Sequence, residues 1–548
     1  MVETAATHRV FNQSPVYGGV NLFDADPLIN SATAGFPDAV RHDLYEVGGS
    51  WGTHEMRDLA RLANRHEPEL QRFDGKGNRL DQVTYHPAYH ALLRRSIASG
   101  LHASAWDTGD TEAGLRHRAR GARLYMTAQS ECGHICPMTM TNAALATLRH
   151  APELFPVWAP RVLSRTYDRS FRPPDEKRGV TLGMAMTEKQ GGTDVRANTT
   201  RAERSSDGLY NVTGHKWFVS APMSDAFLVL AQARGGLTCF LMPRILPDGT
   251  VNAIRLERLK DKLGNRSNAS AEVEFAGARA WRVGDEGRGI PTIIDMVTLT
   301  RLDCATASAG LMRAGFAEAV HHARHRAVFG RALVDQPLML RVLSDMALDL
   351  AAALALSMRL CEAFDMAPDR PAEAAYARLM TPAVKYLVCK MAPAFLAEAM
   401  ECLGGNGYVE DGALPRLYRE APVNAIWEGS GNVIALDVVR ALARAPHAAD
   451  AFLAEIEQSR GASASLDSAI DQLRGDLAEM ADPEVGARRL VERMAVVWGA
   501  TLAVRHGDPE VADAWIASRV GGDHGGLYGT LSPRLPLARL AGRATPTL

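Results

Sequence analysis

No segment of the sequence is a long apolar run: none approaches the roughly 18 consecutive apolar residues that a membrane-spanning helix requires. The first residues, 1–5, also lack the cationic and then apolar layout of a secretory signal peptide. Cysteine is scarce, with seven in 548 residues, and an odd number in a long chain is typical of reduced thiols rather than of a disulfide framework. We therefore expect a cytoplasmic protein with no membrane partner.

A charge excess of either sign is missing as well. Lys and Arg number 61 and Asp and Glu number 63, which leaves a formal net charge of −2. The whole chain thus gives no argument for a polyanionic partner, and any nucleic-acid surface would have to be local. Internal repeats and low-complexity blocks are absent too. At about 150 residues per domain, the length predicts roughly three or four domains.

What is present is an apolar pattern whose period changes along the chain. Residues 1–183 space their apolar groups mostly at three and four, which predicts an N-terminal helical domain. Residues 184–290 alternate with period two between glycine-rich turns, which predicts a middle antiparallel β domain. Long helical patterns return over 291–440, as in a helical bundle. A small polar stretch then leads into residues 441–548, an expected extra C-terminal helical domain, so the expected fold class is α+β multidomain.

Glu428 stands between two different environments. Ile426 and Trp427 precede it with apolar bulk, and a glycine-spaced polar run through Ser430 and Asn432 follows it. An apolar wall raises the pKa of a carboxylate toward neutrality, while glycines let the backbone approach a flat ligand. The pattern therefore predicts a catalytic base, although a helix-capping loop with a solvated glutamate would look the same.

Two glycine-bearing runs lie in the expected β domain. Residues 185–194 contain a glycine pair flanked by threonines, whose backbone and hydroxyl donors suit a phosphate or a ring carbonyl. A tight hairpin explains that run equally well. Residues 214–220 place two aromatic side chains beside a hydroxyl. Because exposed aromatic residues on a strand pack on a neighbouring domain more often than on a cofactor, both interpretations stay open.

Two further runs lie in the expected bundle. Residues 326–331 end a helix with Arg326 close to Phe329 and a glycine. Arginine can pair with a pyrophosphate and phenylalanine can stack on a purine, although the dipole at a helix C-terminus alone also favours arginine. Residues 401–408 form a glycine-rich turn where the backbone can approach an extended ligand.

Two small clusters resemble metal sites only superficially. Cys132, His134 and Cys136 are followed by no second ligand pair at a zinc spacing. Three histidines within residues 321–325 share an expected helix, but neighbouring arginines disfavour a cation there. We therefore predict no metal site.

Together with Glu428, these four runs resemble the acyl-CoA dehydrogenase superfamily, whose two sequence signatures are filled without a gap by residues 185–197 and 401–420. The resemblance implies a helical domain, a β domain and a second helical bundle that bind FAD outside any Rossmann framework. The lack of a GxGxxG phosphate loop is therefore no evidence against a dinucleotide cofactor. The cofactor contacts that the resemblance implies are Met184, Met186, Thr187, Gly192, Thr193, Trp217, Phe218 and Ser220 in the β domain, Arg326, Phe329, Gly404 and Gly405 toward the FAD of a neighbouring subunit, and Ile426, Trp427, Ser430 and Asn432 around the base.

The resemblance also implies a reaction. In this superfamily a carboxylate removes the α-proton of an acyl thioester while a hydride passes from the β-carbon to the flavin. Glu428 matches the usual position of this base. Some members carry the base on the preceding helix, where this chain has Thr300, and many carry an acid that helps to bind coenzyme A where this chain has Thr298. The missing acid weakens the expectation of an ordinary acyl-CoA substrate.

Within the superfamily, the runs at 186–192, 214–218, 255–269 and 415–419 closely resemble the AidB-like flavoproteins of the bacterial adaptive response to DNA alkylation. That resemblance implies a homotetramer, weak dehydrogenase activity on isovaleryl-CoA, and binding of double-stranded DNA through the C-terminal domain. The arginines at positions similar to those implicated in DNA contact are Arg440 and Arg519.

The charge of the C-terminal segment supports two interpretations. Residues 441–548 hold 11 Arg and 14 Asp or Glu, a net charge of −3, which is typical of a solvated, salt-bridged face. Residues 519–548 hold four Arg and one Asp, a net charge of +3, which favours phosphate contacts. We therefore keep two functions open: a DNA-associated flavoprotein that shields DNA or destroys the alkylating agent, and a metabolic acyl-CoA dehydrogenase that acts on an unidentified acyl thioester.

Overall fold

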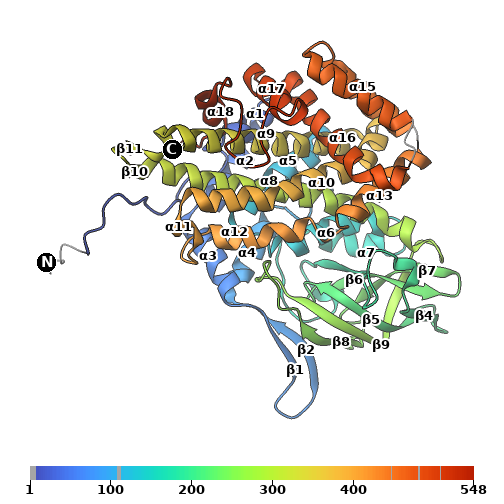
Figure 1. Cartoon of the computed structure of the whole chain (residues 1–548). Helices are drawn as coiled ribbons and strands as arrows, with labels where there is room; N and C mark the ends of the chain where they lie inside the picture. The colour runs from blue at the N-terminus through green and yellow to red at the C-terminus, as the bar shows by residue number, and fades with distance from the viewer. Residues whose placement is uncertain (1–7, 108–112, 446, 479–481, 507, 548) are drawn as a thin grey trace. The chain divides into compact units, whose positions relative to one another are not determined.

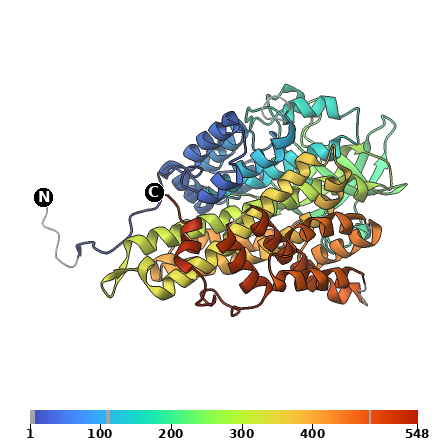
Figure 2. The same cartoon turned by 90° about the horizontal axis from the view of Figure 1, so that it is seen from above.

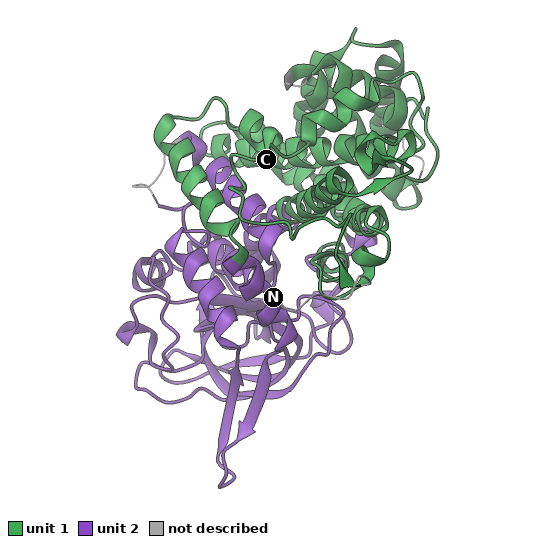
Figure 3. Ribbon diagram, turned by 90° about the vertical axis from the view of Figure 1, so that its left-hand side faces the viewer, with its two compact units in different colours: residues 1–54, 305–425, 434–548 green, residues 55–304, 426–433 purple. Residues whose placement is uncertain are grey.

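The computed structural model describes residues 8–107, 113–445, 447–478, 482–506 and 508–547 (Figure 1). It divides into two compact units, each built from segments far apart in the sequence (Figure 3). Unit 1 comprises Met1–His54, Ala305–Ala425 and Ile434–Leu548, and unit 2 comprises Glu55–Cys304 and Ile426–Val433. The expected fold class, helical parts on either side of a β domain, is confirmed.

Unit 2 contains the helices that precede the β domain. They are α3 (His54–Arg65), which begins at the unit boundary, α4 (Pro87–Ala98), α5 (Arg116–Ser130), α6 (Ile135–Leu148) and α7 (Phe155–Val162). Nearly every side chain of α6 is buried, because a helix that is apolar on all sides belongs in a core. The hydroxyl of Thr141 on α6 accepts a hydrogen bond from the backbone N–H of Leu182 at 3.0 Å. This contact fixes α6 against the first strand of the β domain.

A β-hairpin interrupts these helices, where the sequence pattern predicts mostly helix. β1 (Glu69–Phe73) pairs antiparallel with β2 (Arg79–Thr84). The carboxylate of Asp74 closes the turn by accepting hydrogen bonds from the backbone N–H groups of Lys76 and Asn78, each at 2.8 Å. This side-chain turn explains the difference, because a short aspartate-and-glycine turn ends one strand and starts the next.

The β domain consists of β3 (Leu182–Ala185), β4 (Arg201–Arg204), β5 (Tyr210–Ser220), β6 (Ala226–Ala233), β7 (Gly236–Pro243), β8 (Ile254–Leu259) and β9 (Ser270–Val283). The strands pair in the order β3-β6-β4-β5-β9-β7, with β8 added to β9 and β7 paired with β6. The sheet thereby closes on itself. The expected antiparallel arrangement is wrong for two pairs, since β3 and β4 run parallel to β6. Both reach β6 only through intervening chain, whereas strands joined by a tight hairpin must be antiparallel.

Unit 1 is mainly helical. Its elements are α1 (Pro27–Ala32), α2 (Asp38–Trp51), the last part of α8 (Gly289–His325), β10 (Ala327–Val328), β11 (Arg331–Ala332), α9 (Pro337–Met366), α10 (Pro371–Cys402), α11 (Gly405–Tyr408), α12 (Leu414–Asn424), most of α13 (Gly431–Arg444), α14 (His447–Ile456), α15 (Ala464–Ala478), α16 (Pro483–His506), α17 (Pro509–Trp515) and α18 (Leu537–Ala544). Among the helices of the described ranges, none has the length and apolarity needed to cross a membrane.

The long helices α9 and α10 form the centre of unit 1. They run side by side, and α14, α16 and α18 pack against them (Figures 1 and 2). Buried alanine, leucine and methionine side chains line both long helices along their length. The helices after residue 440 therefore share one core with the bundle.

Buried ion pairs add to this contact between the C-terminal segment and α9. Arg519 Nε and Nη2 donate to Asp349 at 3.1 and 2.8 Å, and Nη2 also donates to Asp345. The hydroxyl of Tyr528 donates to the other oxygen of Asp349 at 2.8 Å. Burial opposes the charge of the Arg519 guanidinium, but the two carboxylates outweigh burial and hold its pKa above the ordinary value.

Candidate active site

Glu428 lies in unit 2, in the segment between α12 and α13, and α8 holds it in place. The hydroxyl of Thr300 donates to Glu428 Oε2 at 2.7 Å, and Arg301 Nε donates to the Glu428 carbonyl oxygen at 2.8 Å. The φ of Glu428 is +59°, which is uncommon for a residue with a side chain and recurs at functional sites. The carboxylate is therefore fixed rather than freely solvated, which favours a base over a capping loop alone.

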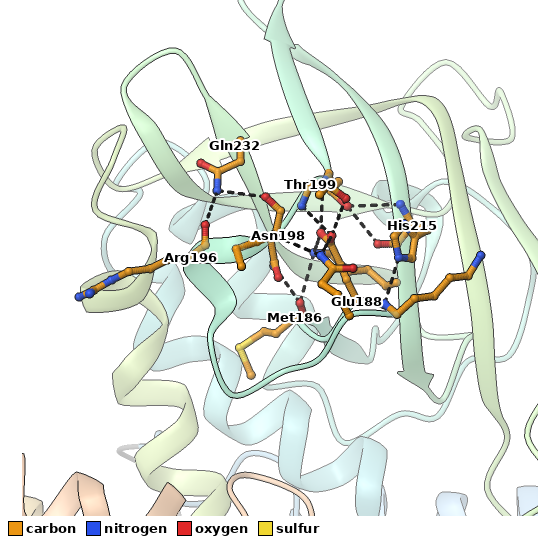
Figure 4. A network of polar contacts seen from close by, with 12 residues as sticks. Met186, Glu188, Arg196, Asn198, Thr199, His215 and Gln232 are labelled. Atoms are coloured by element: carbon orange, nitrogen blue, oxygen red, sulfur yellow. Dashed lines mark hydrogen bonds and ion pairs between the residues drawn. The ribbon is translucent and has the colours of Figure 1, made fainter.

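The β domain, which also belongs to unit 2, holds the backbone of the signature loop, residues 186–193 (Figure 4). The carbonyl oxygen of Met186 accepts a hydrogen bond from Lys216 Nζ at 3.2 Å. The carbonyl oxygen of Thr187 accepts one from the backbone N–H of Trp217 at 2.8 Å. Strand β5 therefore sets the position of the loop from both its backbone and a side chain.

A buried carboxylate, Glu188, anchors the same loop (Figure 4). It is 0% exposed and accepts hydrogen bonds from the backbone N–H groups of Thr199 and Thr200 at 2.7 and 3.1 Å, and from Lys216 Nζ at 2.9 Å. Burial works to raise the pKa of Glu188, but these hydrogen bonds hold it below its ordinary value. Burial lowers the pKa of Lys216 to about 8, so both partners are charged at neutral pH.

The exposed face of β5 and the signature loop offer groups that suit a flat, partly polar ring. Phe218 is 51% exposed on β5, and the Ser220 hydroxyl lies 3.3 Å from that of Ser270 on β9. Gly192 is required by a close approach, because a Cβ there would lie 2.4 Å from the Thr187 hydroxyl. An apolar face with hydroxyl donors at its edge is the combination that ligand sites use, so these residues fit the flavin ring of FAD.

Cys136 on α6 connects the two sides of this region. The Lys262 ammonium and the side chains of Ser220 and Asn268 work to lower the pKa of its thiol, whereas the Glu428 carboxylate works to raise it. Burial raises the pKa of the Cys136 thiol to about 12, so it is neutral. The expected base and the β5 hydroxyl therefore belong to one cluster of side chains within unit 2.

Sequence reasoning missed three members of this cluster. Cys136 had been considered only as a metal ligand, and Lys262 and Asn268 lie in the run at residues 255–269, whose only signal was its family resemblance. The expected residues that unit 2 contains are Met184, Met186, Thr187, Gly192, Thr193, Trp217, Phe218, Ser220, Ile426, Trp427, Glu428, Ser430 and Asn432.

Unit 1 contains the other expected cofactor contacts, which are Arg326, Phe329, Gly404 and Gly405. Phe329 is 98% exposed at the tip of the β10–β11 hairpin, where it and Gly330 have φ of +51° and +77°. Both values are typical of a type I′ turn, which phenylalanine rarely enters. Asn12 braces this hairpin: its side chain exchanges two hydrogen bonds with the backbone of Ala327, at 2.7 and 2.8 Å. Because Phe329 packs little within the chain, its placement supports an outward-facing role.

The histidines of the two superficial metal patterns have protein partners. His134 Nδ1 lies 2.6 Å from Glu131 Oε2, and its Nε2 lies 2.8 Å from the Ser96 hydroxyl. His321 Nε2 lies 2.8 Å from the carbonyl oxygen of Pro15. Within the described ranges, no group of three or more His, Cys, Asp or Glu side chains could hold a metal ion.

The two arginines expected at DNA differ in their surroundings. Arg440 is exposed on α13, whereas the Arg519 side chain is 12% exposed and bound to the aspartates of α9. Arg440 is therefore open to solvent, and the burial of Arg519 argues against a DNA contact by that residue. A groove of about 960 Å³ beside Arg519 is also lined by two exposed arginines of α16, Arg488 and Arg489.

Comparisons with known proteins agree with this geometry. Residues 12–169 match the adaptive response protein AidB N-terminal domain, residues 183–278 the acyl-CoA dehydrogenase middle domain, and residues 287–443 the acyl-CoA dehydrogenase C-terminal domain. The chain is 47% identical over 511 residues to AidB of Escherichia coli (strain K12), covering 93% of this chain and 94% of that protein.

Solved structures show the same similarity in three dimensions. Caenorhabditis elegans ACDH-11 in complex with C11-CoA superposes with a TM-score of 0.86 at 28% identity, covering 94% of each chain. An acyl-CoA dehydrogenase of Bacillus anthracis complexed with FAD superposes with a TM-score of 0.68 at 16% identity, covering 93% of this chain and 87% of that chain, and so shares the fold.

Proposed function

Because the chain belongs to the acyl-CoA dehydrogenase family, in its AidB branch, we propose that it dehydrogenates an acyl thioester with Glu428 as the base. Family membership makes it an FAD-dependent oxidoreductase. The observation that carries the proposal is that Thr300 donates a hydrogen bond to the Glu428 carboxylate at 2.7 Å, within the unit that also contains Ser220, a residue expected at the flavin.

The residues of this chain divide the reaction between them. FAD, when bound, supplies the acceptor for a hydride. The signature loop, with Phe218 and Ser220, would hold its ring. Glu428 takes the α-proton as the Cα–H bond breaks, the hydride leaves the β-carbon with its electron pair, and a double bond forms between the two carbons. Since Thr300 and Arg301 hold the glutamate at its carboxylate and its backbone, the base meets the substrate in one orientation.

Replacing Thr300 by valine tests this orientation. Thr300→Val keeps the side-chain shape but removes the donor to Glu428, so we expect kcat to fall about tenfold with little change in KM, as for a lost hydrogen bond to a charged group. Thr300→Ser retains the hydroxyl and is the matched control. Steady-state kinetics at saturating acyl-CoA measure the effect, and an unchanged kcat in Thr300→Val would exclude a positioning role.

The substrate class is inferred from relatives of this chain. ACDH-11, the structural relative, is in complex with C11-CoA, which supports a coenzyme A thioester here as well. The family resemblance favours a short branched chain such as isovaleryl-CoA. Anaerobic mixing of the FAD-loaded protein with a panel of acyl-CoAs of rising length and branching distinguishes these two kinds of acyl-CoA, because a productive substrate bleaches the flavin. Bleaching by none of them contradicts dehydrogenation of acyl-CoA.

A second proposal is that the protein binds double-stranded DNA and protects it from alkylation, by shielding it or by destroying the alkylating agent. The exposed Arg440 and the exposed arginines of α16 favour this proposal, because guanidinium groups bind phosphates without regard to sequence. The buried Arg519 is left out of the proposed surface.

Arg440→Ala tests the DNA surface. We expect weaker binding to every duplex sequence, and a slope of log affinity against log salt that is smaller by about one, because one phosphate contact is lost. Arg201→Ala, an exposed arginine on β4 of unit 2, is the matched control. Fluorescence anisotropy of a labelled duplex across a salt series measures both. The absence of wild-type binding even at low salt would remove the DNA component of the proposal.

Two expectations from the resemblance complete the proposed function. The chain is proposed to form a homotetramer in which Arg326 and Phe329 reach the FAD of a neighbouring subunit, which the exposure of Phe329 supports. Light scattering of the purified protein tests the number of chains.

A cytoplasmic location is also proposed, since all seven cysteines are free and buried, as in a reducing compartment.

A further inference from the structure

Lys262 lies on the connection between β8 and β9 and reaches the hydroxyl groups of the proposed flavin site. Its Nζ donates to the carbonyl oxygen of Asn268 at 2.6 Å and to the hydroxyl of Ser270 at 3.1 Å. Ser270 Oγ in turn lies 3.3 Å from Ser220 Oγ. One hydroxyl group therefore separates the ammonium of Lys262 from the residue at which the flavin is expected.

The residues that accept hydrogen bonds from the Lys262 ammonium are buried. Asn268 is 1% exposed and Ser270 is 6% exposed, so water screens the region weakly. At the thiol of Cys136, the Lys262 ammonium works to lower the pKa and the Glu428 carboxylate works to raise it.

We propose that Lys262 is an electrostatic and positioning residue for FAD, which favours the reduced, electron-rich state of the flavin through Ser270 and Ser220. The inference rests on the proposed function, which places the flavin ring at Ser220. In that reaction a hydride carries two electrons from the substrate β-carbon to the flavin, while the α-proton goes to Glu428. Negative charge thus increases at the flavin, and the Lys262 ammonium nearby makes the transfer more favourable.

A purely structural role for Lys262 has different consequences. Its hydrogen bond to the Asn268 carbonyl could serve only to hold the loop between β8 and β9. Removing such a bond would lower stability or FAD affinity, whereas only an electrostatic role changes the balance between oxidised and reduced flavin. The reduction potential therefore separates the two roles, and it is measured without any acyl-CoA.

The experiment compares the two-electron midpoint potential of bound FAD in wild type, Lys262→Met and Lys262→Arg. We expect at least a tenfold shift toward oxidised flavin in Lys262→Met, about 30 mV for a two-electron couple. Lys262→Arg should recover most of this shift because it restores the charge. Arg258→Met is the control, because it removes the same charge from β8. The Arg258 side chain is 64% exposed and pairs with Glu272, which remains paired with Lys260 in the variant. We expect it to shift the potential by less than a third as much.

An unchanged potential in Lys262→Met with FAD retained overturns the inference, as does an equal shift in Arg258→Met. If Lys262→Met does not retain FAD, Lys262→Gln takes its place, because it keeps a donor toward Ser270 without the charge. A wild-type potential in Lys262→Gln then overturns the inference too. Failure of the proposed function is recognised separately, since wild type would then bind no FAD or show no bleaching by any acyl-CoA.

Discussion

Replacing Glu428 by glutamine is expected to lower the rate of anaerobic flavin bleaching by an acyl-CoA by roughly 10²- to 10⁴-fold, the usual contribution of a general base. Glutamine keeps the shape of the side chain and can still accept a hydrogen bond from Thr300. It cannot take the α-proton at any accessible pH. Stopped-flow absorbance of the FAD-loaded variant measures this rate, with FAD content determined for each sample.

The control for this variant is Glu410→Gln, which removes an exposed carboxylate that is paired with Arg419 in unit 1. It should bleach at the wild-type rate. Bleaching of Glu428→Gln at more than a tenth of the wild-type rate, with normal FAD content, would assign the base to another residue. That outcome would leave the family assignment intact but would require a different proton acceptor near the Cys136 cluster.

Replacing Lys216 by methionine is expected to produce the largest loss of stability. The substitution leaves Glu188 charged, buried and without its ammonium partner, and breaking a buried ion pair in this way costs about 3–5 kcal/mol. For a protein of this size the midpoint of thermal unfolding should fall by about 3–4 °C, because the unfolding entropy is roughly 2.1 cal/mol/K per residue. The signature loop also loses the hydrogen bond from Lys216 to the Met186 carbonyl, so weaker FAD binding should accompany the loss.

Thermal unfolding followed by circular dichroism, with and without added FAD, measures this effect. Lys189→Met is the matched control in the same loop, because Lys189 is exposed and its ammonium lies 5.7 Å from the centre of the Trp217 ring. The double variant Glu188→Gln with Lys216→Met should be more stable than Lys216→Met alone, since no unpaired charge is buried. Equal midpoints for Lys216→Met and Lys189→Met would show that the buried pair contributes little.

The parts of the site that could be predicted are those determined by neighbours in the sequence. The signature at residues 185–197 specifies its own turn, and Gly192 is required there by contact with Thr187, five positions earlier. The helix and strand patterns likewise located α9, α10 and the strands of the β domain. Glu428 could be singled out because its apolar and glycine-rich flanks are adjacent to it.

The parts that could not be predicted depend on pairing between distant segments. Glu188 and Lys216 are 28 positions apart, and each by itself has the sequence appearance of a solvated charge. The role proposed for Lys262 depends on the pairing of β5 with β9, which brings Ser270 beside Ser220. Composition and periodicity contain no signal for such contacts, since they report burial along one segment at a time.

The same reason explains the expectation for Arg519. In the sequence, Arg519 lies in a tail of net positive charge, but its partners, Asp345 and Asp349, lie more than 160 positions earlier on α9. Only the fold reveals that this arginine is paired with carboxylates. Arg440, in contrast, is exposed and stays in the proposed DNA surface.

The pairing of Arg519 with α9 limits how this chain can recombine with its relatives. A chimera that takes residues 441–548 from one parent and α9 from another inherits the arginine and its two aspartates from different sources. If either side differs, an unpaired charge remains in the interior, which destabilises by about 3–5 kcal/mol. Viable crossovers are therefore expected where α9 and the terminal helices descend together, so the terminal segment is inherited as part of the bundle and not as a transferable module.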